Sequence, residues 1–429
     1  MGNQSNKTVS IIGLGYVGLP LALLLGRKGY KVTGVDINSE RVESLNKRIA
    51  PFADQEITEQ LRNASFEATM DFSRIKDVGV IIICVPTPVY ANHMPNLEPV
   101  QNACKSIASH LQKGQLVILE STVNPGVCES IILPILEKGS ELQCGKDFYL
   151  AHCPERINPG DKKWNVENIP RVVGGFDEVS LQKAIAFYAT IISAEIKPMA
   201  SLKEAEAVKI VENAFRDINI AFVNELAMSF SRFGIDTVSV LNGAATKPFA
   251  FMPHYPGCGV GGHCIPVDPY YLIDYAKKNG FRHEFLSLAR RINNDMPRYT
   301  IELLEKALKE RGLAVIGAKV AVLGLAYKAE VGDCRESPSL EIIKLLEDEY
   351  GARVVSFDPF VLDKSTAKTL DEAVKGVDAV IVATAHNVFK KLEPDYFTKN
   401  GVKVVIDGRN ALLKEKFIES GIIYEGIGR

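Results

Sequence analysis

The sequence predicts an α/β protein built from two doubly wound domains that are joined by a long central helical segment. Short, continuous apolar runs alternate with helical stretches near the N-terminus, and the same pattern returns in the last third of the chain. A long stretch with helical spacing lies between the two. At 429 residues the chain is also too long for one ordinary hydrophobic core.

The N-terminal part begins with a predicted βαβ unit. Residues 8–36 run as an apolar strand, a glycine turn, an apolar helix that stops at Gly29, and a second strand ending in Asp36. Further strands are predicted at 78–85 and 116–120, since both runs are short and apolar throughout, as parallel strands covered on both faces are. This part therefore predicts an open sheet with helices on its faces.

The middle of the chain predicts two long helices. Residues 202–233 contain no glycine or proline and carry apolar residues at helical spacing, so one helix is expected to end at Gly234. A second helix is expected over 285–311, interrupted near Pro297. Such helices either pack domains together or form a dimer interface, and the pattern fits both readings equally.

The last third repeats the first. Residues 319–358 again read strand, turn, helix and a strand ending in aspartate, and DAVIVATAHN at Asp378 echoes VGVIIICVPTP at Val78. The turn here is only GLA, and the insertion YKAEVGDCRESP supplies Lys328 and Arg335. We expect a different, phosphate-bearing ligand in this half, although Arg335 could equally be a structural partner of a neighbouring acid.

The composition bears on possible partners, on the cellular environment and on whether the chain can span a membrane. The formal net charge is -2 with 24% charged residues, which gives no general case for nucleic acid or an anionic membrane as partner. Eight cysteines are scattered without a CxxC pair, so a reduced, cytoplasmic protein is expected. The longest apolar runs are about half of the ~18 residues that a membrane span needs.

The first glycine turn has the spacing of a dinucleotide site. Gly13, Gly15 and Gly18 follow a strand and open a helix, so the backbone can approach a pyrophosphate at the helix N-terminus. Asp36 closes the next strand, where a carboxylate can accept both ribose hydroxyls, and no arginine follows it directly. This favours NAD over NADP. The alternative is a tight turn with close helix packing and no ligand.

The stretch GCGVGGHCIPVDP, residues 257–269, mixes four glycines with two cysteines, a histidine and an aspartate. One interpretation is a metal knot of His254, Cys258, His263 and Cys264. The other is a flexible loop that brings one thiol to a substrate. Adjacent His263 and Cys264 suit one tetrahedral metal poorly, and a metal-bound thiolate could not attack a carbonyl, so no metal is expected.

Eight ordered motifs resemble the UDP-glucose/GDP-mannose dehydrogenase family, the nucleotide-sugar 6-dehydrogenases. They are GLGYVGLP with Asp36, VPTP, ESTVNPG, CPERINPG, VKIVENAFRD, PGCGVGGHCIPVDPYYL, GLAYK and DCRESPS. The resemblance implies two Rossmann-like domains and two successive hydride transfers from the C6 alcohol of a UDP-sugar to NAD. It divides the chain into an NAD-binding domain at 1–200, a central helical, catalytic and dimerisation domain at 201–312, and a UDP-sugar-binding domain at 313–429.

The resemblance also implies catalytic roles. Cys264 matches the family nucleophile, which would form a thiohemiacetal and then a thioester on the substrate. Lys209 and Asn213, four residues apart on one helix, would hold the C6 oxyanion. Asp268 would support the lysine and the catalytic water. Glu155 would be the general base for thioester hydrolysis, and Thr122 would position water or substrate.

Two further groups of residues match binding motifs. The expected cofactor-binding residues are Gly13, Gly15, Tyr16, Val17, Gly18, Asp36, Arg41, Pro86, Thr87, Ser121 and Thr122. The expected substrate-binding residues are Arg156, Lys209, Asn213, Lys247, Tyr255, Gly259, Gly261, Tyr327, Lys328, Arg335 and Arg409. Of the second group, Lys247 is expected to reach the site of a neighbouring subunit, as a basic residue does in the family. The family resemblance and the long central helices lead us to expect a homodimer or a higher homo-oligomer.

The motif variants indicate which sugar is oxidised. UDP-glucose dehydrogenases have a motif closer to GGxCFPKD, whereas this chain has His263 and Val267 and is similar to the N-acetylhexosamine branch. UDP-N-acetylglucosamine is expected first, UDP-N-acetylmannosamine is a close rival, and UDP-glucose is the third alternative. The product class suggests polysaccharide biosynthesis. The rival classes are a single-step hydroxy acid dehydrogenase, which needs no cysteine, and a non-catalytic NAD-binding protein.

Overall fold

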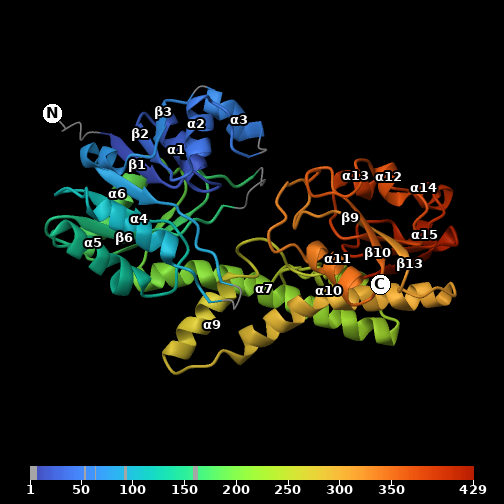
Figure 1. The fold of residues 1–429 in the computed structure, drawn as a ribbon. Helices are drawn as coiled ribbons and strands as arrows, with labels where there is room; N and C mark the ends of the chain where they lie inside the picture. The colour runs from blue at the N-terminus through green and yellow to red at the C-terminus, as the bar shows by residue number, and fades with distance from the viewer. Residues whose placement is uncertain (1–6, 53–54, 63, 91–93, 158–162) are drawn as a thin grey trace. The chain divides into compact units, whose positions relative to one another are not determined.

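The computed structural model describes residues 7–52, 55–62, 64–90, 94–157 and 163–429, and the chain forms two compact units. The first unit comprises Met1–Glu212 with Tyr270–Phe281, and the second comprises Asn213–Pro269 with Arg282–Arg429 (Figure 1). The last three residues of the CPERINPG motif lie outside the described residues. The three-domain division of the chain stays a prediction.

The first unit is built on an eight-stranded sheet of order β3-β2-β1-β4-β5-β6-β7-β8. Neighbouring strands are parallel except for β6 and β7, which are antiparallel. In chain order the strands are β1 Thr8–Ile12, β2 Lys31–Val35, β3 Phe66–Thr69, β4 Val80–Ile83, β5 Leu116–Leu119, β6 Tyr149–His152, β7 Arg171–Gly175 and β8 Ile196–Pro198. The strand order changes direction between β1 and β4, where dinucleotides bind in doubly wound sheets.

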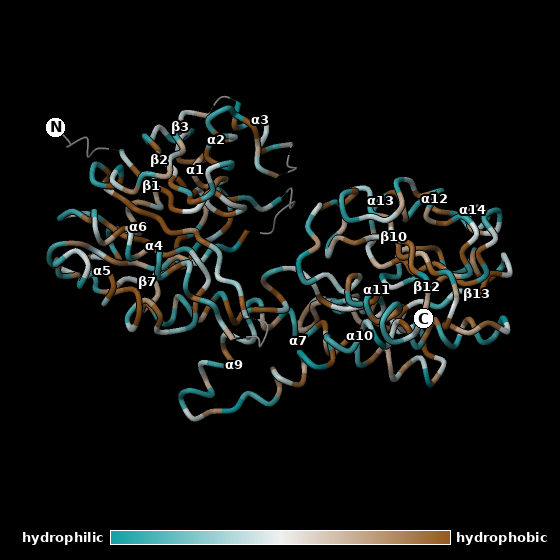
Figure 2. Tube along the Cα trace, viewed as in Figure 1, coloured by the Kyte–Doolittle hydropathy of each residue, from teal (hydrophilic) through white to brown (hydrophobic). Residues whose placement is uncertain are grey.

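Helices cover both faces of this sheet. Their bounds are α1 Gly18–Arg27, α2 Ser39–Asn46, α3 Gln55–Arg62, α4 Glu98–Ala108, α5 Leu133–Ser140 and α6 Glu178–Tyr188, with short helical turns at Phe72–Asp77 and Cys128–Ile132. Alternate strand residues point to opposite faces, so Ile11 packs with α1 and α6 while Ile12 packs with α4 and α5. Figure 2 shows the strands as the apolar centre of the unit. The predicted βαβ unit and both further strands are confirmed.

The second unit contains a five-stranded, all-parallel sheet of order β10-β9-β11-β12-β13. Its strands are β9 Lys319–Leu323, β10 Arg353–Phe357, β11 Ala379–Val382, β12 Val404–Asp407 and β13 Ile423–Gly426. One face packs against α10 Glu284–Glu310 and α11 Pro338–Asp348. The other packs against α12 Leu370–Val374, α13 Asn387–Lys390, α14 Pro394–Lys399 and α15 Lys414–Glu419. The predicted repeat of the doubly wound pattern is confirmed.

One long helix ends at the glycine where an end was expected, whereas the other continues through the proline where a break was expected. Helix α7 spans Leu202–Phe233 and ends before Gly234, whose φ of 70° is left-handed, as predicted. Helix α10 runs through Pro297 without a break, so the predicted interruption is wrong. Pro297 is buried, and its neighbours Met296 and Ile301 belong to the core of the second unit. Packing therefore outweighs the hydrogen bond that proline removes, a loss of ~3 kcal/mol.

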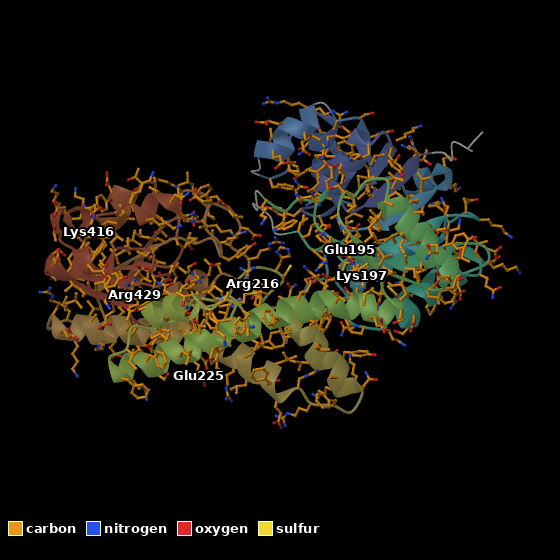
Figure 3. The ribbon with its side chains drawn as sticks, turned by 180° about the vertical axis from the view of Figure 1, so that it is seen from behind. Glu195, Lys197, Arg216, Glu225, Lys416 and Arg429 are labelled. Carbon is orange, nitrogen blue, oxygen red and sulfur yellow. The ribbon has the colours of Figure 1, made fainter. Side chains whose placement is uncertain are left out.

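The C-terminal residue is held to the rest of the second unit by an ion pair. Arg429, labelled in Figure 3, places Nε 3.2 Å from Asp236 Oδ2, and Lys414 Nζ lies 3.0 Å from the same oxygen. Asp236 also caps α8, Thr237–Ala244, by accepting a hydrogen bond from the Ser239 N–H. One carboxylate thus connects a helix start, α15 and the C-terminus. Helix α9, Asp268–Lys278, completes the helices among the described residues.

Candidate active site

In the glycine turn after β1, two of the glycines lie so close to backbone carbonyl oxygens that a side chain would not fit. A Cβ at Gly13, whose φ is 95°, would lie 2.8 Å from the carbonyl oxygen of Cys84 at the end of β4. A Cβ at Gly18 would lie 1.9 Å from the carbonyl oxygen of Gly13. Both positions therefore require glycine for the turn itself. The start of α1 is held against the turn as a result, which places its N-terminal amides at the switch point of the sheet.

The middle glycine faces a different environment. A Cβ at Gly15 would meet nothing within 4 Å, so the turn is open at the position where a pyrophosphate approaches the backbone. Asp36, at the end of β2, accepts hydrogen bonds from the Leu14 and Asn38 N–H groups at 2.8 and 2.9 Å, and Arg41 lies 2.9 Å from it. These contacts fix the carboxylate beside the turn. The residues present fit NAD.

Two more loops meet at this edge of the sheet. Ser121, directly after β5, donates a hydrogen bond to the carbonyl oxygen of Val85 at 2.7 Å, which joins the ESTVNPG turn to the VPTP segment after β4. The Tyr271 hydroxyl donates to the carbonyl oxygen of Thr87 at 2.6 Å. Three sequence motifs that are far apart in the chain are thus brought together within the first unit. Thr122 follows Ser121 and is half-buried.

A buried ionic cluster lies behind these loops. The Arg171 guanidinium is fully buried, 2.8 Å from Glu155 Oε2 and 3.6 Å from Glu120 Oε2, and Tyr188 donates a hydrogen bond to Glu120 Oε1 at 2.5 Å. Burial raises the pKa of Glu120 to about 7, against the lowering effect of Arg171. Glu120 therefore takes up a proton more readily than an ordinary carboxyl, which reduces the negative charge that one arginine has to balance.

The position of Glu155 bears on its predicted role. Its Oε1 accepts hydrogen bonds from the N–H groups of Arg156 and Ile157, at 2.6 and 2.7 Å, while Oε2 faces Arg171. The side chain is buried and shapes the CPER turn. Arg156 itself is engaged by the carbonyl oxygen of Pro170 and by Glu212. The roles of Glu155 as base and of Arg156 in substrate binding stay predictions.

Helix α7 is anchored to the ESTVNPG turn by Glu206. This carboxylate accepts hydrogen bonds from the Gly126 N–H and, at 2.8 Å, from the Cys128 N–H. Burial raises the pKa of Glu206 to about 7, opposed by the hydrogen bond from Cys128. Lys209 lies one turn further along the same helix and is half-buried. Glu206 therefore fixes the start of the helix that carries this predicted catalytic lysine.

The glycines of the 257–264 loop have a structural reason of their own. A Cβ at Gly261 would come within 2.7 Å of the Glu336 carbonyl oxygen, and one at Gly262, φ 92°, within 2.9 Å of the Tyr327 ring. At Gly259, φ 133°, it would meet Pro338 at the same distance. The loop is therefore pressed against the insertion that follows β9, which is a second reason for these glycines besides access to a substrate.

The predicted nucleophile lies where this loop enters α9. The Cys264 carbonyl accepts hydrogen bonds from the Val267 and Asp268 N–H groups, at 3.0 and 2.8 Å, which turns the chain into the helix. Asp268 is buried and accepts a 2.5 Å hydrogen bond from the Asn213 side-chain amide of α7. Cys264 is half-exposed, whereas the other seven cysteines are buried. The second unit thus brings together Cys264, Asp268 and Asn213.

The remaining predicted substrate residues lie around the same unit. Arg409 uses its guanidinium to donate to the carbonyl oxygens of Ala383 and Gly259, at 3.0 and 3.2 Å, so it anchors the loop. Tyr255 donates to Asn242 at 2.9 Å. Lys247 is exposed and lies 4.8 Å from the centre of the Phe249 ring. Tyr327 and Lys328 are half-buried beside β9.

The turn after β9 is filled by protein. Ala326, at the position equivalent to Gly15, is buried, and Asp358, at the position equivalent to Asp36, accepts hydrogen bonds from the Leu325 and Ala326 N–H groups. Burial opposes ionisation of Asp358, but hydrogen bonds from His386 and from these amides hold its pKa below the ordinary value. His386 and Asp358 are fully buried, 3.0 Å apart. This turn is not available to a dinucleotide.

Some contributors to the site gave no usable sequence signal. Arg171 begins an apolar strand and Tyr188 ends an ordinary helix, so neither pattern indicated a buried cluster. Tyr271 lies inside the PYYL motif, but only the structure shows its bond to the Thr87 carbonyl oxygen. Among the described residues no group of three or more histidine, cysteine, aspartate or glutamate side chains is arranged to hold a metal.

Comparison with known proteins identifies the class. Family models for the NAD binding, central and UDP binding domains of the UDP-glucose/GDP-mannose dehydrogenase family match residues 7–192, 203–295 and 321–414. The chain belongs to the UDP-glucose/GDP-mannose dehydrogenase family. It is therefore an oxidoreductase, a nucleotide-sugar dehydrogenase that uses NAD, and its last third is the domain that binds UDP. No helix in the part of the chain that is described has the length and apolar character to cross a membrane.

Individual relatives cover nearly the whole chain. It is 39% identical to UDP-N-acetyl-D-glucosamine 6-dehydrogenase of Pseudomonas aeruginosa over 92% of this chain and 94% of the relative. It is 37% identical to UDP-N-acetyl-D-mannosamine dehydrogenase of Pyrococcus horikoshii over 98% and 99%. A solved structure of UDP-D-ManNAc dehydrogenase from the latter organism matches with a TM-score of 0.93 at 36% identity, covering 98% of this chain and 99% of that one.

Proposed function

We propose that this protein oxidises the C6 alcohol of a UDP-N-acetylhexosamine twice to give the uronic acid, with UDP-N-acetylglucosamine as the first choice of substrate. The observation that carries the proposal is the half-exposed Cys264, four residues before the start of α9 and joined to Asp268 by a backbone hydrogen bond, in the same unit as the UDP-binding domain. A single-step alcohol dehydrogenase would need no such thiol.

The proposed chemistry divides between cofactor and protein. When bound, NAD accepts one hydride in each of the two oxidations. The thiolate of Cys264 attacks the C6 aldehyde, a C–S bond forms and the carbonyl electron pair moves to oxygen, which gives a thiohemiacetal. Loss of the second hydride leaves a thioester. Water then adds at C6 and the C–S bond breaks, which releases the acid and regenerates the thiolate.

The protein groups around C6 act on charge and on water. Lys209 and Asn213 lie four residues apart on α7, where an ammonium and an amide can hold the developing oxyanion. Asp268 accepts the Asn213 amide N–H and so fixes which atoms of that amide are presented. Thr122 positions the water or the substrate. Glu155, if it is the base, must exchange one of its present contacts for that water.

The choice of a sugar with an acetamido group is based on the loop sequence and on the named relatives. His263 and Val267 stand where the UDP-glucose branch has other residues, and relatives named for UDP-N-acetylglucosamine and UDP-N-acetylmannosamine are about equally similar. UDP-N-acetylmannosamine is the second candidate, supported by the high structural similarity to an enzyme named for it. The two sugars differ only in the direction of one group at C2.

The test is a stoichiometry measurement. Limiting UDP-GlcNAc, UDP-ManNAc, UDP-GalNAc or UDP-glucose is incubated with excess NAD, and NADH is followed to completion. We expect two NADH per UDP-GlcNAc. The same yield from another of these sugars would contradict the choice of substrate but support the twofold oxidation. One NADH per sugar means that the aldehyde is released, and no NADH from any of the four sugars contradicts the proposed activity.

We also propose that the protein forms a homodimer through the exposed apolar side chains of the second unit. Phe215 and Phe222 on α7 are 49% and 51% exposed, and Phe285 on α10 is 65% exposed. Large exposed aromatic residues on neighbouring segments are typical of a subunit interface. Sedimentation equilibrium is expected to give twice the chain mass, and a mass of one chain contradicts this proposal.

A further inference from the structure

The insertion after β9 reaches the predicted nucleophile loop through one arginine. Arg335 donates from Nε to both carboxylate oxygens of Asp333, at 3.0 and 3.1 Å, and from Nη2 to Asp333 Oδ2 at 2.6 Å. The same Nη2 lies 3.2 Å from Nδ1 of His263. The backbone repeats the connection, because the Gly262 N–H donates to the Arg335 carbonyl oxygen at 3.0 Å. Asp333, Arg335 and His263 therefore form a chain of contacts that ends one residue before Cys264.

The hydrogen-bonding chemistry of arginine defines the state of His263. A guanidinium can only donate, so the ring nitrogen that faces it must accept and cannot carry a proton. His263 is then neutral, with its N–H on Nε2. Burial opposes ionisation of Asp333, but the hydrogen bonds from Arg335 hold its pKa below the ordinary value, so Asp333 stays charged and keeps the guanidinium fixed.

The backbone next to this contact is closely packed against the insertion. Gly262 lies against the ring of Tyr327, and Gly261 lies against the backbone of Glu336, with no room for a Cβ at either position. The loop therefore cannot shift relative to the insertion without losing these contacts. Side-chain contacts from a residue next to a reacting group set that group's orientation, and misplacing a reacting group by about 1 Å can cost ~100-fold in rate.

We propose that Asp333, Arg335 and His263 form a positioning relay that orients the Cys264 loop, and that the relay works only with a neutral His263. The inference rests on the proposed function. Protonation puts a cation in place of the acceptor, directly beside Arg335, and breaks the contact. The charged and titratable groups around His263 include Arg335 and Asp333 from the insertion, the Tyr327 phenol against Gly262, and Cys264 next in the chain.

The relay has a consequence for the pH profile. At low pH the imidazole protonates. The sign is fixed by the acceptor role, since gaining a proton removes the lone pair that Arg335 uses. Protonation of His263 is therefore expected to add to the fall in kcat that loss of the Cys264 thiolate causes in acid. Removing the titratable ring while keeping an acceptor at the same place should make the fall with pH less steep.

The test uses three substitutions of His263 in the full chain. Asn places its side-chain oxygen near the position of Nδ1 and does not titrate, whereas Gln reaches the position of Nε2, and Ala removes both. We expect His263→Asn to keep kcat within about threefold of the parent enzyme and to show a less steep acid fall, while His263→Gln and His263→Ala lose about tenfold or more in kcat. Asp333→Asn should also lower kcat, because it weakens the hold on Arg335.

Controls separate the relay from folding and from the proposed function. Thermal melting and NADH binding to the first unit are measured for every variant, and unchanged values show that a loss of kcat is not a loss of fold. Equal kcat values for all three His263 variants, or an acid fall equally steep in His263→Asn and in the parent enzyme, contradict the relay. A parent enzyme that gives no NADH with any UDP-sugar contradicts the proposed function instead, whatever the variants do.

Discussion

Cys264→Ser is expected to lower the rate of acid formation by roughly 10³-fold or more, because a hydroxyl is a far weaker nucleophile than a thiolate at neutral pH. The first oxidation needs no sulfur, so the variant should release aldehyde and give at most one NADH per sugar. NADH yield at completion measures this directly. Trapping the released aldehyde with a hydrazine reagent gives a second, independent readout.

The loop supplies its own control cysteine. Cys258 is six residues away and fully buried, and its thiol faces the carbonyl oxygen of Ala383 at 3.5 Å. Burial raises the pKa of this thiol, which removes it further from reactivity. Cys258→Ala should still give two NADH per sugar, at some loss of stability from the small cavity. A yield of two NADH per sugar from Cys264→Ser would contradict the proposed covalent mechanism.

Arg171→Met is expected to be the most destabilising single substitution considered. It removes the cation that both Glu120 and Glu155 face, and leaving buried carboxyls without their partner costs about 3–5 kcal/mol. The carboxyls can escape the penalty by binding protons, so the loss should be smaller at about pH 5 than at about pH 8. Urea unfolding of parent and variant at both pH values measures the difference in the free energy of unfolding.

A surface ion pair in the same unit provides the matched comparison. Arg74 Nη2 lies 3.0 Å from Glu67 Oε2, but both side chains are about half-exposed. Arg74→Met should therefore change the free energy of unfolding by less than about 1 kcal/mol, with little dependence on pH. If Arg171→Met costs no more than Arg74→Met, the buried cluster does not stabilise the first unit in the way described.

The fold was predictable where one local signal decided it. The bounds of α7 follow from a run without glycine or proline and from a left-handed glycine at its end. The passage of α10 through Pro297 was not predictable, because Met296 and Ile301 on either side of it pack in a core with residues distant in sequence, such as Val320 and Leu346. Local rules give the cost of a buried proline, whereas the core that offsets this cost is formed only in three dimensions.

The candidate site, like the fold, could be predicted from the sequence only in part. Motif spacing indicated Gly13 and Gly15, and the family resemblance indicated Cys264, since each is expected to perform a task that few residue types can perform. The contacts of His263 and Arg171 could not be derived, because their partners come from segments 72, 51 and 16 residues away. A charged residue in a sequence shows that a partner is needed but does not show which one it will be. The catalytic roles stay predictions until the variants are measured.

The filled turn after β9 imposes an order on the proposed reaction. Since Ala326 and Asp358 close that turn, the two NAD molecules of the proposed twofold oxidation would bind one after the other at the turn after β1. The half-oxidised sugar would then have to stay bound while the cofactor is exchanged. An aldehyde bound only by weak contacts could escape during that exchange. In the proposed mechanism a covalent bond to Cys264 would therefore serve retention as well as catalysis.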